Sequence, residues 1–287
     1  MKRETLGARD QGSHSAPAEP ALKGGASGTD SRPSASATAA ARWGCMTIVG
    51  TAGWSIASAA AGSFSEGGSA LERYASVFTG VEINSSFHRS HRAATWARWE
   101  ASVPERFRFA VKMPKTISHA RKLRDCADLA AAFVEETAAL GPKLSVLLLQ
   151  LPPKLAFDAV LAEEFLTMLA AMTSVRIACE PRHPSWFGPE AEALLDRLQV
   201  ARVAADPAVV PEAAEPGGWR GLAYWRLHGT PVMYRSAYGP ERLAPYAEAI
   251  AAAEAEGADA WCMFDNTASS VATADALEMA RLISGGR

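Results

Sequence analysis

Eight short apolar segments alternate with segments of helical periodicity from residue 46 onward. This alternation predicts an α/β fold, and in particular a (β/α)8 TIM barrel, because its strand count and its length of about 240 residues match that barrel. The apolar segments are nearly continuous in hydrophobicity, as the strands of a buried parallel sheet are. An open doubly wound sheet is the main alternative, but no Gly-rich dinucleotide-binding turn accompanies the strands.

The expected elements follow from two hydrophobic patterns. Short apolar runs predict strands at residues 46–50, 80–84, 108–112, 145–150, 176–180, 201–206, 223–228 and 260–265. A period of about 3.6 residues predicts helices at residues 69–78, 91–101, 125–140, 161–172 and 189–198. Gly141 and Pro142 should stop the third of these helices. Residues 207–218 are rich in Pro and Gly, so a loop is expected in place of the sixth helix.

Residues 1–45 differ from the rest of the sequence. They are rich in Ala, Ser, Gly and Pro and carry almost no large apolar side chain. Such a segment buries too little surface to offset its ordering entropy, which predicts a disordered tail before a barrel domain at residues 46–287. Met46 directly precedes the first expected strand, so a start assigned too far upstream would explain the tail.

Composition narrows the class of protein. The sequence has 29 Lys and Arg against 31 Asp and Glu, so its formal charge of -2 does not favour a general nucleic-acid coat. It contains no apolar run of about 18 residues, so no membrane span is expected. The four cysteines are scattered without a CxxC pair, which indicates a reducing compartment and hence the cytoplasm.

Polar residues gather where the expected strands end. Side chains alternate across a strand, so Glu82 should face the same side as Asn84, and Arg226 the same side as His228. In a TIM barrel the carboxyl ends of the strands form the mouth that carries the chemistry. The strand ends supply Glu82, Asn84, Lys112, Gln150, Glu180, Asp206, Arg226, His228, Asp265 and Asn266. These groups could instead form ion pairs that only satisfy one another, although buried ionic networks are a weak source of stability.

Two sets of roles follow from these side chains and the loops after them. The candidate catalytic residues, with carboxylates and an imidazole for proton transfer, are Glu82, Glu180, His228, Asp206 and Asp265. The candidate substrate-binding residues are Trp54, Asn84, Lys112, Gln150, Arg182, His183, Trp186, Arg226 and Asn266. The turn at residues 50–55 could also hold an anion on its backbone N–H groups, and Tyr234 and Tyr238 could stack on a ring.

A metal site is a weaker interpretation of the same strand ends. Hard divalent cations take carboxylate and imidazole donors, here those of Glu82, Glu180, Asp206, His228 and Asp265. The cations Lys112, Arg182 and Arg226 would compete for those carboxylates. No metal ligand is therefore assigned, and the cofactor is left unknown.

The motifs together resemble the YecE-like family, a group of TIM-barrel proteins of unknown function. The matching stretches are residues 50–55, 81–87, 107–112, 149–153, 180–187, 226–229 and 264–267. They run in the family's order along nearly the whole expected barrel. His88 stands where the family usually has Tyr. The resemblance implies the fold and names no reaction, and likeness to metal-dependent endonucleases rests on fold analogy alone.

The sequence supports three hypotheses about function. The first is an enzyme (a hydrolase, lyase or isomerase) that applies acid–base chemistry to a phosphate- or carboxylate-bearing substrate at the barrel mouth. The second is metal-dependent phosphodiester hydrolysis. The third is non-catalytic binding of nucleic acid through the basic loop at residues 112–122, which includes Lys115 and Lys122. The sequence does not indicate an oligomeric state.

Overall fold

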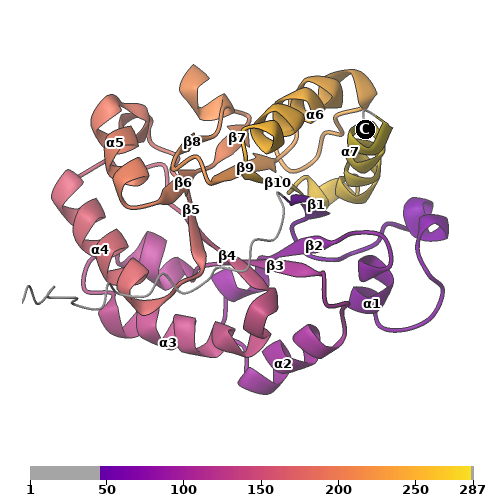
Figure 1. Cartoon of the computed structure of the whole chain (residues 1–287), viewed down its shortest axis with the longest axis horizontal. Helices are drawn as coiled ribbons and strands as arrows, with labels where there is room; N and C mark the ends of the chain where they lie inside the picture. The colour runs from indigo at the N-terminus through magenta and orange to yellow at the C-terminus, as the bar shows by residue number, and fades with distance from the viewer. Residues whose placement is uncertain (1–45, 286–287) are drawn as a thin grey trace, which may run out of the picture. The chain divides into compact units, whose positions relative to one another are not determined.

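The computed structural model describes residues 46–285, so the expected tail at residues 1–45 lies outside the described residues. The strands are β1 (Thr47–Thr51), β2 (Gly80–Ile83), β3 (Arg108–Lys112), β4 (Leu144–Gln150), β5 (Arg176–Glu180), β6 (Val200–Arg202), β7 (Ala204–Asp206), β8 (Gly217–Gly218), β9 (Leu222–Leu227) and β10 (Asp259–Phe264). The helices, which surround the strands in Figure 1, are α1 (Ala70–Ala75), α2 (Ala93–Ala101), α3 (Ala127–Thr137), α4 (Ala159–Met172), α5 (Pro189–Arg197), α6 (Pro240–Ala255) and α7 (Ala272–Gly285).

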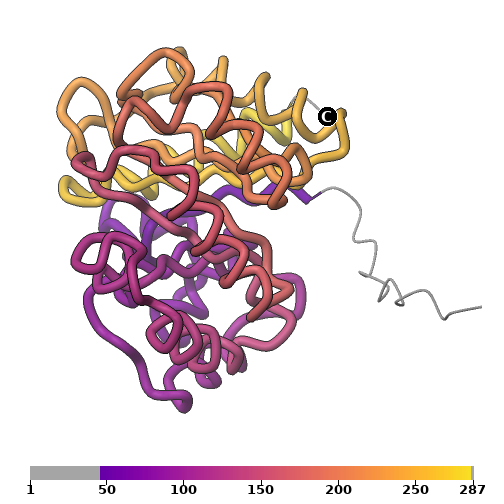
Figure 2. The backbone as a smooth tube through the Cα atoms, turned by 90° about the vertical axis from the view of Figure 1, so that its left-hand side faces the viewer, coloured from indigo at the N-terminus to yellow at the C-terminus, as the bar shows by residue number. Residues whose placement is uncertain are grey.

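The strands close into a parallel barrel. One ladder runs β2-β3-β4-β5-β6 and the other β7-β9-β10-β1. The sixth barrel strand is divided, because β6 pairs with β5 while β7 pairs with β9. A bridge between Ala52 and Glu82 joins β1 to β2. The first and last barrel strands close the barrel, since β1 pairs in parallel with β10, and Figure 2 shows the indigo β1 segment among the yellow segments of the last part of the chain. The predicted TIM-barrel fold is confirmed.

Two glycines permit the close approach of β1 and β2. A Cβ atom at Gly50 would lie 2.3 Å from the carbonyl oxygen of Gly80, and a Cβ atom at Gly80 would lie 2.4 Å from the Ile48 side chain. Real Cβ atoms do not come that close, so any larger residue would push the strands apart. The two glycines thus allow the barrel to close at this seam.

Local sequence signals set the helix ends. The Ser69 hydroxyl accepts from the N–H of Glu72, whose carboxylate accepts from the N–H of Ser69, which forms a capping box at the start of α1. The Asp158 carboxylate caps α4 by accepting from the N–H of Leu161. After α3, the chain makes one further turn before Gly141 takes a positive φ of 54°, which ends helical geometry as expected.

The expected loop replaces the sixth helix. Between β7 and β9 the chain forms only a 3-10 turn at Pro211–Ala214 and the two-residue strand β8, which pairs antiparallel with β6. Proline-rich sequence cannot supply the repeated N–H donors of an α-helix, which accounts for the loop. Within residues 46–285, no helix is long and apolar enough to cross a membrane.

Apolar side chains form two layers on the two faces of the strands. Ile83 and Leu227 pack outward against the helices, as the alternation predicts. Ile48, Val146 and Trp261 belong to a second cluster inside the barrel. The inner cluster fills the barrel interior beneath the polar strand ends, so the polar residues lie above a layer of packed apolar side chains.

Candidate active site

Arg226 is the centre of a buried cluster of charges. Its Nε and Nη2 donate to the two oxygens of Glu82 at 3.0 and 2.6 Å, a bidentate arrangement. Nη1 donates to Glu180 at 2.5 Å, and Nη2 also donates to Asp265 at 2.9 Å. Arg226 and Glu82 have no solvent exposure, and Glu180 has 1%. With His228, these four residues form what we call the charge cluster, and β2, β5, β9 and β10 each end in it.

His228 extends the charge cluster toward the loops. Its Nδ1 lies 3.1 Å from the Asp265 carboxylate, and its Nε2 lies 3.1 Å from Glu180 Oε1. Arg182 donates to the same Glu180 oxygen at 2.9 Å and approaches Nε2 of His228 at 3.3 Å. The imidazole can therefore donate to Glu180 when charged, or accept from Arg182 when neutral. The imidazole of His228 therefore has a hydrogen-bond partner at Nε2 in its charged form and in its neutral form, as a group that accepts and releases a proton needs.

The charges control the ionisation of the carboxylates. Burial opposes the charged form of Glu180, but the positive charges of Arg226 and Arg182 outweigh it and hold the pKa of Glu180 well below its ordinary value. Burial likewise opposes charge on Asp265, whereas Arg226 and the hydrogen bond from His228 lower its pKa. Both groups are therefore carboxylates at neutral pH.

A cavity of about 450 Å³ lies at the mouth of the barrel beside the charge cluster. We call it the mouth cavity, and it is lined by Asn84, Ser85, Phe87, His88, Lys112, His119, Gln150, Tyr234 and Asp265. Five of the residues predicted from the sequence thus lie together here, namely Asn84, Lys112, Gln150, Tyr234 and Asp265. Asp265 joins the two sites, because one oxygen, Oδ2, bonds to Arg226 and His228 while Oδ1 bonds to no residue within 46–285.

Three polar side chains of the mouth cavity lack a protein partner. The side chains of Asn84 and Gln150 make no hydrogen bond to any residue within 46–285, and Oδ1 of Asn84 is fully buried. Lys112 is only 8% exposed, and its Nζ makes no ion pair in that range but lies 4.3 Å from the centre of the Phe87 ring. Burial, and then the charge of Arg226, lowers the pKa of Lys112 to about 8. Buried polar atoms are normally paired, so the unpaired Oδ1 of Asn84, beside Lys112 and Gln150 in the same cavity, indicates a place for a ligand.

Three residues to which the sequence patterns assigned no role of their own also lie at the site. His119 lines the mouth cavity, its Nδ1 lies 2.9 Å from the Ser118 hydroxyl, and burial together with the charge of Lys112 lowers its pKa. Phe87 provides the ring under Lys112. Tyr224 donates to Glu82 at 2.9 Å from beneath the charge cluster. Tyr224 precedes Arg226 by two residues on the same strand face, so the alternation of side chains could have revealed it.

Two predicted residues lie on the opposite face of their strands. Asp206 accepts from the hydroxyls of Tyr238 at 2.5 Å and Thr230 at 2.6 Å, outside the barrel interior. Asn266 donates to Asp275 of α7 at 2.7 Å and is fully buried there. Both side chains anchor loops, and neither lines the mouth cavity. We therefore leave them out of the proposed site.

Three further predicted residues pack within or beneath loops. The ring of Trp54 meets that of Trp99 edge-on, with centres 5.1 Å apart. Trp186 is 1% exposed and donates from Nε1 to the carbonyl of Leu155 at 3.0 Å. His183 accepts from the N–H of Ser185, which fixes its own loop. These contacts give the three residues a structural role away from the mouth cavity, so they too are left out.

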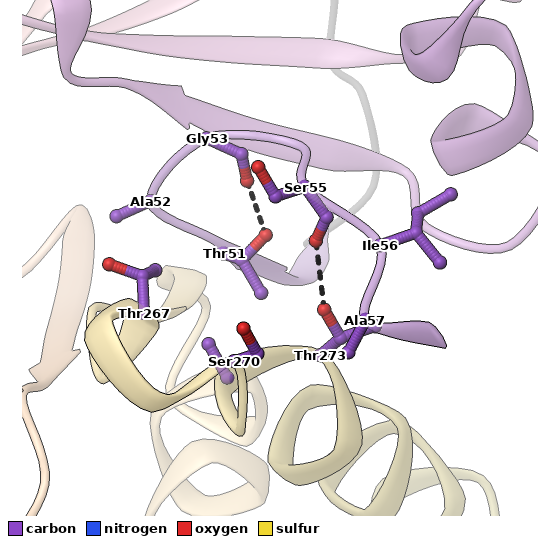
Figure 3. A pocket seen from close by; sticks show the side chains of 10 residues that line it. Thr51, Ala52, Gly53, Ser55, Ile56, Ala57, Thr267, Ser270 and Thr273 are labelled. Carbon is purple, nitrogen blue, oxygen red and sulfur yellow. Dashed lines mark hydrogen bonds between the residues drawn. The ribbon is translucent and has the colours of Figure 1, made fainter. Parts of the chain in front are cut away.

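A second cavity of about 320 Å³ lies between the turn after β1 and the start of α7 (Figure 3). Its hydroxyls are partly engaged, since Thr51 donates to the carbonyl of Gly53 at 2.5 Å and Thr273 to that of Ser55 at 3.0 Å. The N–H groups of Ala52 and Gly53 donate to the strand carbonyls of Phe264 and Glu82. The turn therefore closes the barrel, and these two N–H groups are not free to hold an anion.

The carboxylates and the imidazole at the barrel mouth also test the hypothesis of a metal site. Among residues 46–285, no group of three or more His, Cys, Asp or Glu side chains is arranged to hold a metal ion. The carboxylates of Glu82 and Glu180 are directed at Arg226 instead. The observed geometry thus gives the metal hypothesis no support.

These features define a class of protein: a TIM barrel with a buried charge cluster and an adjoining polar cavity at the carboxyl ends of its strands. Residues 48–286 match the family described as "Protein of unknown function DUF72", and the chain belongs to that family. The resemblance to YecE-like proteins inferred from the motifs is confirmed.

Relatives agree with this assignment. Over 129 residues the chain is 34% identical to the UPF0759 protein YecE of Escherichia coli strain K12, a match that covers 44% of this chain and 47% of that protein. The match thus spans about half the length of this curated relative. Among solved structures, the barrel is similar to DUF72 family proteins of Enterococcus faecalis V583 and Thermotoga maritima MSB8, with TM-scores of 0.70 and 0.69. They share 21% and 22% identity, over 83% of this chain and 96% and 99% of theirs, which shows the fold alone.

Proposed function

We propose that the chain is an enzyme that binds an anionic small molecule in the mouth cavity and performs acid–base chemistry on it. The observation that carries this proposal is the convergence of three unpartnered polar side chains, Asn84, Lys112 and Gln150, on one cavity. A protein loses stability by burying an acceptor such as Asn84 Oδ1 without a partner, so a ligand is expected to supply one. Lys112 provides a positive charge without a carboxylate partner, which favours a carboxylate or phosphate.

The residues have distinct roles in this proposal. Lys112 attracts the anion, while Asn84 and Gln150 orient it by hydrogen bonds. Asp265 transfers the proton, because its Oδ1 is unengaged and it lines the cavity. His228 lies behind Asp265 and can exchange a proton with it through Nδ1. Arg226, with the two saturated glutamates of the charge cluster, holds Asp265 and His228 in place.

Two further points complete the proposal. Nucleic-acid binding through the basic loop would be a separate property, because the exposed Lys115 and Lys122 do not line the mouth cavity. We also propose a cytoplasmic location, which is supported by the free thiols of Cys126, Cys179 and Cys262.

A binding screen with matched variants tests the proposal. The thermal unfolding of four proteins would be measured in the presence of each member of a panel of small carboxylates and phosphate esters. The four proteins are wild type, Lys112→Met, Gln150→Leu and Lys115→Met. A ligand at about 100 times its Kd stabilises the fold by about 2.7 kcal/mol. We expect this shift in wild type and in Lys115→Met, whose side chain is exposed, and its loss in Lys112→Met and Gln150→Leu. Equal shifts in all four proteins would contradict the proposal.

A further inference from the structure

We infer that Lys112 is also a nucleophile, whose Nζ condenses with the carbonyl carbon of an aldehyde or 2-oxo acid bound in the mouth cavity to form an imine. This inference rests on the proposed function and names the substrate class for the same cavity. The substrate would carry a carbonyl group for Lys112, together with oxygen atoms that Asn84 and Gln150 can bind.

The surroundings of Lys112 differ from those of a structural lysine in the same barrel. Lys143 is similarly buried, at 4% exposure, but its Nζ donates to the carbonyls of Glu100 and Val103 at 2.7 and 2.9 Å. It also pairs with the Glu100 carboxylate at 3.0 Å. Lys112 has none of these contacts, and its Nζ lies over Phe87 at the edge of an open cavity. One lysine is held in place, while the other is available to react.

The electrostatic surroundings keep part of Lys112 in the reactive form. Burial is the largest influence on its pKa, followed by Arg226, while Glu180, Glu82 and Asp265 act in the opposite direction. The resulting pKa of about 8, against an ordinary 10.5, increases the fraction of free amine at neutral pH about 300-fold. His119 is a further titratable group at this point. The remaining ammonium form still attracts an anionic substrate.

The condensation balances with the groups already at the site. The free amine attacks the carbonyl carbon, the new C–N bond forms, and the carbonyl oxygen takes a proton to give a carbinolamine. Loss of that hydroxyl as water leaves a protonated imine, so ammonium plus carbonyl gives iminium plus water. Asp265 lines the same cavity and can take the ammonium proton and return it to the departing oxygen. No oxidant or other reactant is needed.

The iminium links this step to acid–base chemistry. Its positive nitrogen makes the neighbouring C–H bond more acidic, because the electron pair left behind can move onto nitrogen. Asp265 is then placed to take that proton. Loss of the proton to Asp265 neutralises the nitrogen and gives an enamine, and protonation of that enamine on carbon restores the iminium.

Reductive trapping tests the inference. The full-length protein would be incubated at neutral pH with glyoxylate, a small carbonyl anion, and sodium cyanoborohydride, which converts an imine to a stable secondary amine. Peptide mass spectrometry would then compare labelling at Lys112 with labelling at the exposed Lys115, three residues away. We expect Lys112 to be labelled at least about tenfold faster. Equal or slower labelling at Lys112 would overturn the inference.

Two variants separate this inference from the proposed function. Lys112→Arg has no primary amine at position 112, so trapping there should vanish, and Lys112→Met tests the binding of the anion. If an anion binds to wild type and not to Lys112→Met, yet Lys112 is not preferentially labelled, imine formation is wrong and the proposed function stands. If Lys112→Met affects no binding, the proposed function fails as well.

Discussion

Replacing Lys112 with methionine should stabilise the folded protein. The cause is the low pKa of the buried ammonium group, about 8 against an ordinary 10.5, which means that the folded protein holds this proton less tightly than the unfolded chain does. A pKa difference of that size corresponds to about 3 kcal/mol. Methionine has a similar length and no charge, so it removes this cost while it still covers Phe87. We therefore expect Lys112→Met to be more stable by about 3 kcal/mol at neutral pH.

The same difference in the pKa of Lys112 between the folded and unfolded states determines how the stability depends on pH. Below pH 8, lysine is protonated in both the folded and the unfolded protein, and the full cost is present. Between pH 8 and pH 10.5 the unfolded chain binds more protons than the folded protein, so the stability of wild type rises with pH. Above that range both forms are neutral and the cost is gone. The advantage of Lys112→Met should thus shrink across this window.

Urea unfolding of wild type and variant from pH 6 to pH 11 would measure this difference, since the effects of all other groups cancel in the comparison. Lys115→Met serves as the control because that side chain is exposed, and it should show no such pH-dependent gain. The reasoning would be refuted by a Lys112→Met protein that is no more stable than wild type at neutral pH. An advantage that stays constant up to pH 11 would refute it too.

Three further changes test the surrounding structure. Arg226→Met should cost about 3–5 kcal/mol in urea unfolding, because it leaves buried carboxylates without a partner, and an unchanged urea midpoint would contradict this. Wild type should lose stability as the pH falls below 4.5, because the unfolded chain then binds a proton at Glu180 that the folded protein, with its lowered pKa, does not yet bind. Glu180→Gln should have a flatter acid profile, and identical profiles would count against the assignment. Tyr238→Phe removes the hydrogen bond to Asp206 and should cost about 1–3 kcal/mol in thermal unfolding with ligand affinity preserved.

The sequence was sufficient to predict the barrel strands, because each is a short apolar run whose side chains are buried on both faces, but neither the division of the sixth strand into β6 and β7 nor the Gly-Gly strand β8 was predicted. It was also sufficient to place Glu82, Arg226 and His228, since alternation along each strand fixes which side chains point inward. The same rule, applied more strictly, would have excluded Asp206. Ala201 and Val203 lie in the inner cluster while Ala204 lies in the outer one, so a side chain two residues after Ala204 faces outward.

Loop residues were harder to predict for a physical reason. Beyond the last hydrogen-bonded pair of a strand, alternation no longer fixes the direction of a side chain, and local contacts decide it instead. Trp186 follows β5 by six residues and turns to the carbonyl of Leu155, a partner distant in sequence. His119 lies in the helical turn Thr116–Ala120 after β3, from which its side chain lines the mouth cavity. Neither direction could be derived from residue type or spacing.

The hydrogen bonds made by all three side-chain nitrogens of Arg226 matter for protein engineering. All of its donor nitrogens are engaged with side chains at the ends of three other strands, so the base of the site keeps its shape whether or not a small molecule is present. Asn84 and Gln150 line the mouth cavity and would decide selectivity. They take no part in the hydrogen bonds of Arg226, and their side chains bond to no residue within 46–285. Substitutions at these two positions could therefore retune which compound is accepted while the scaffold stays intact.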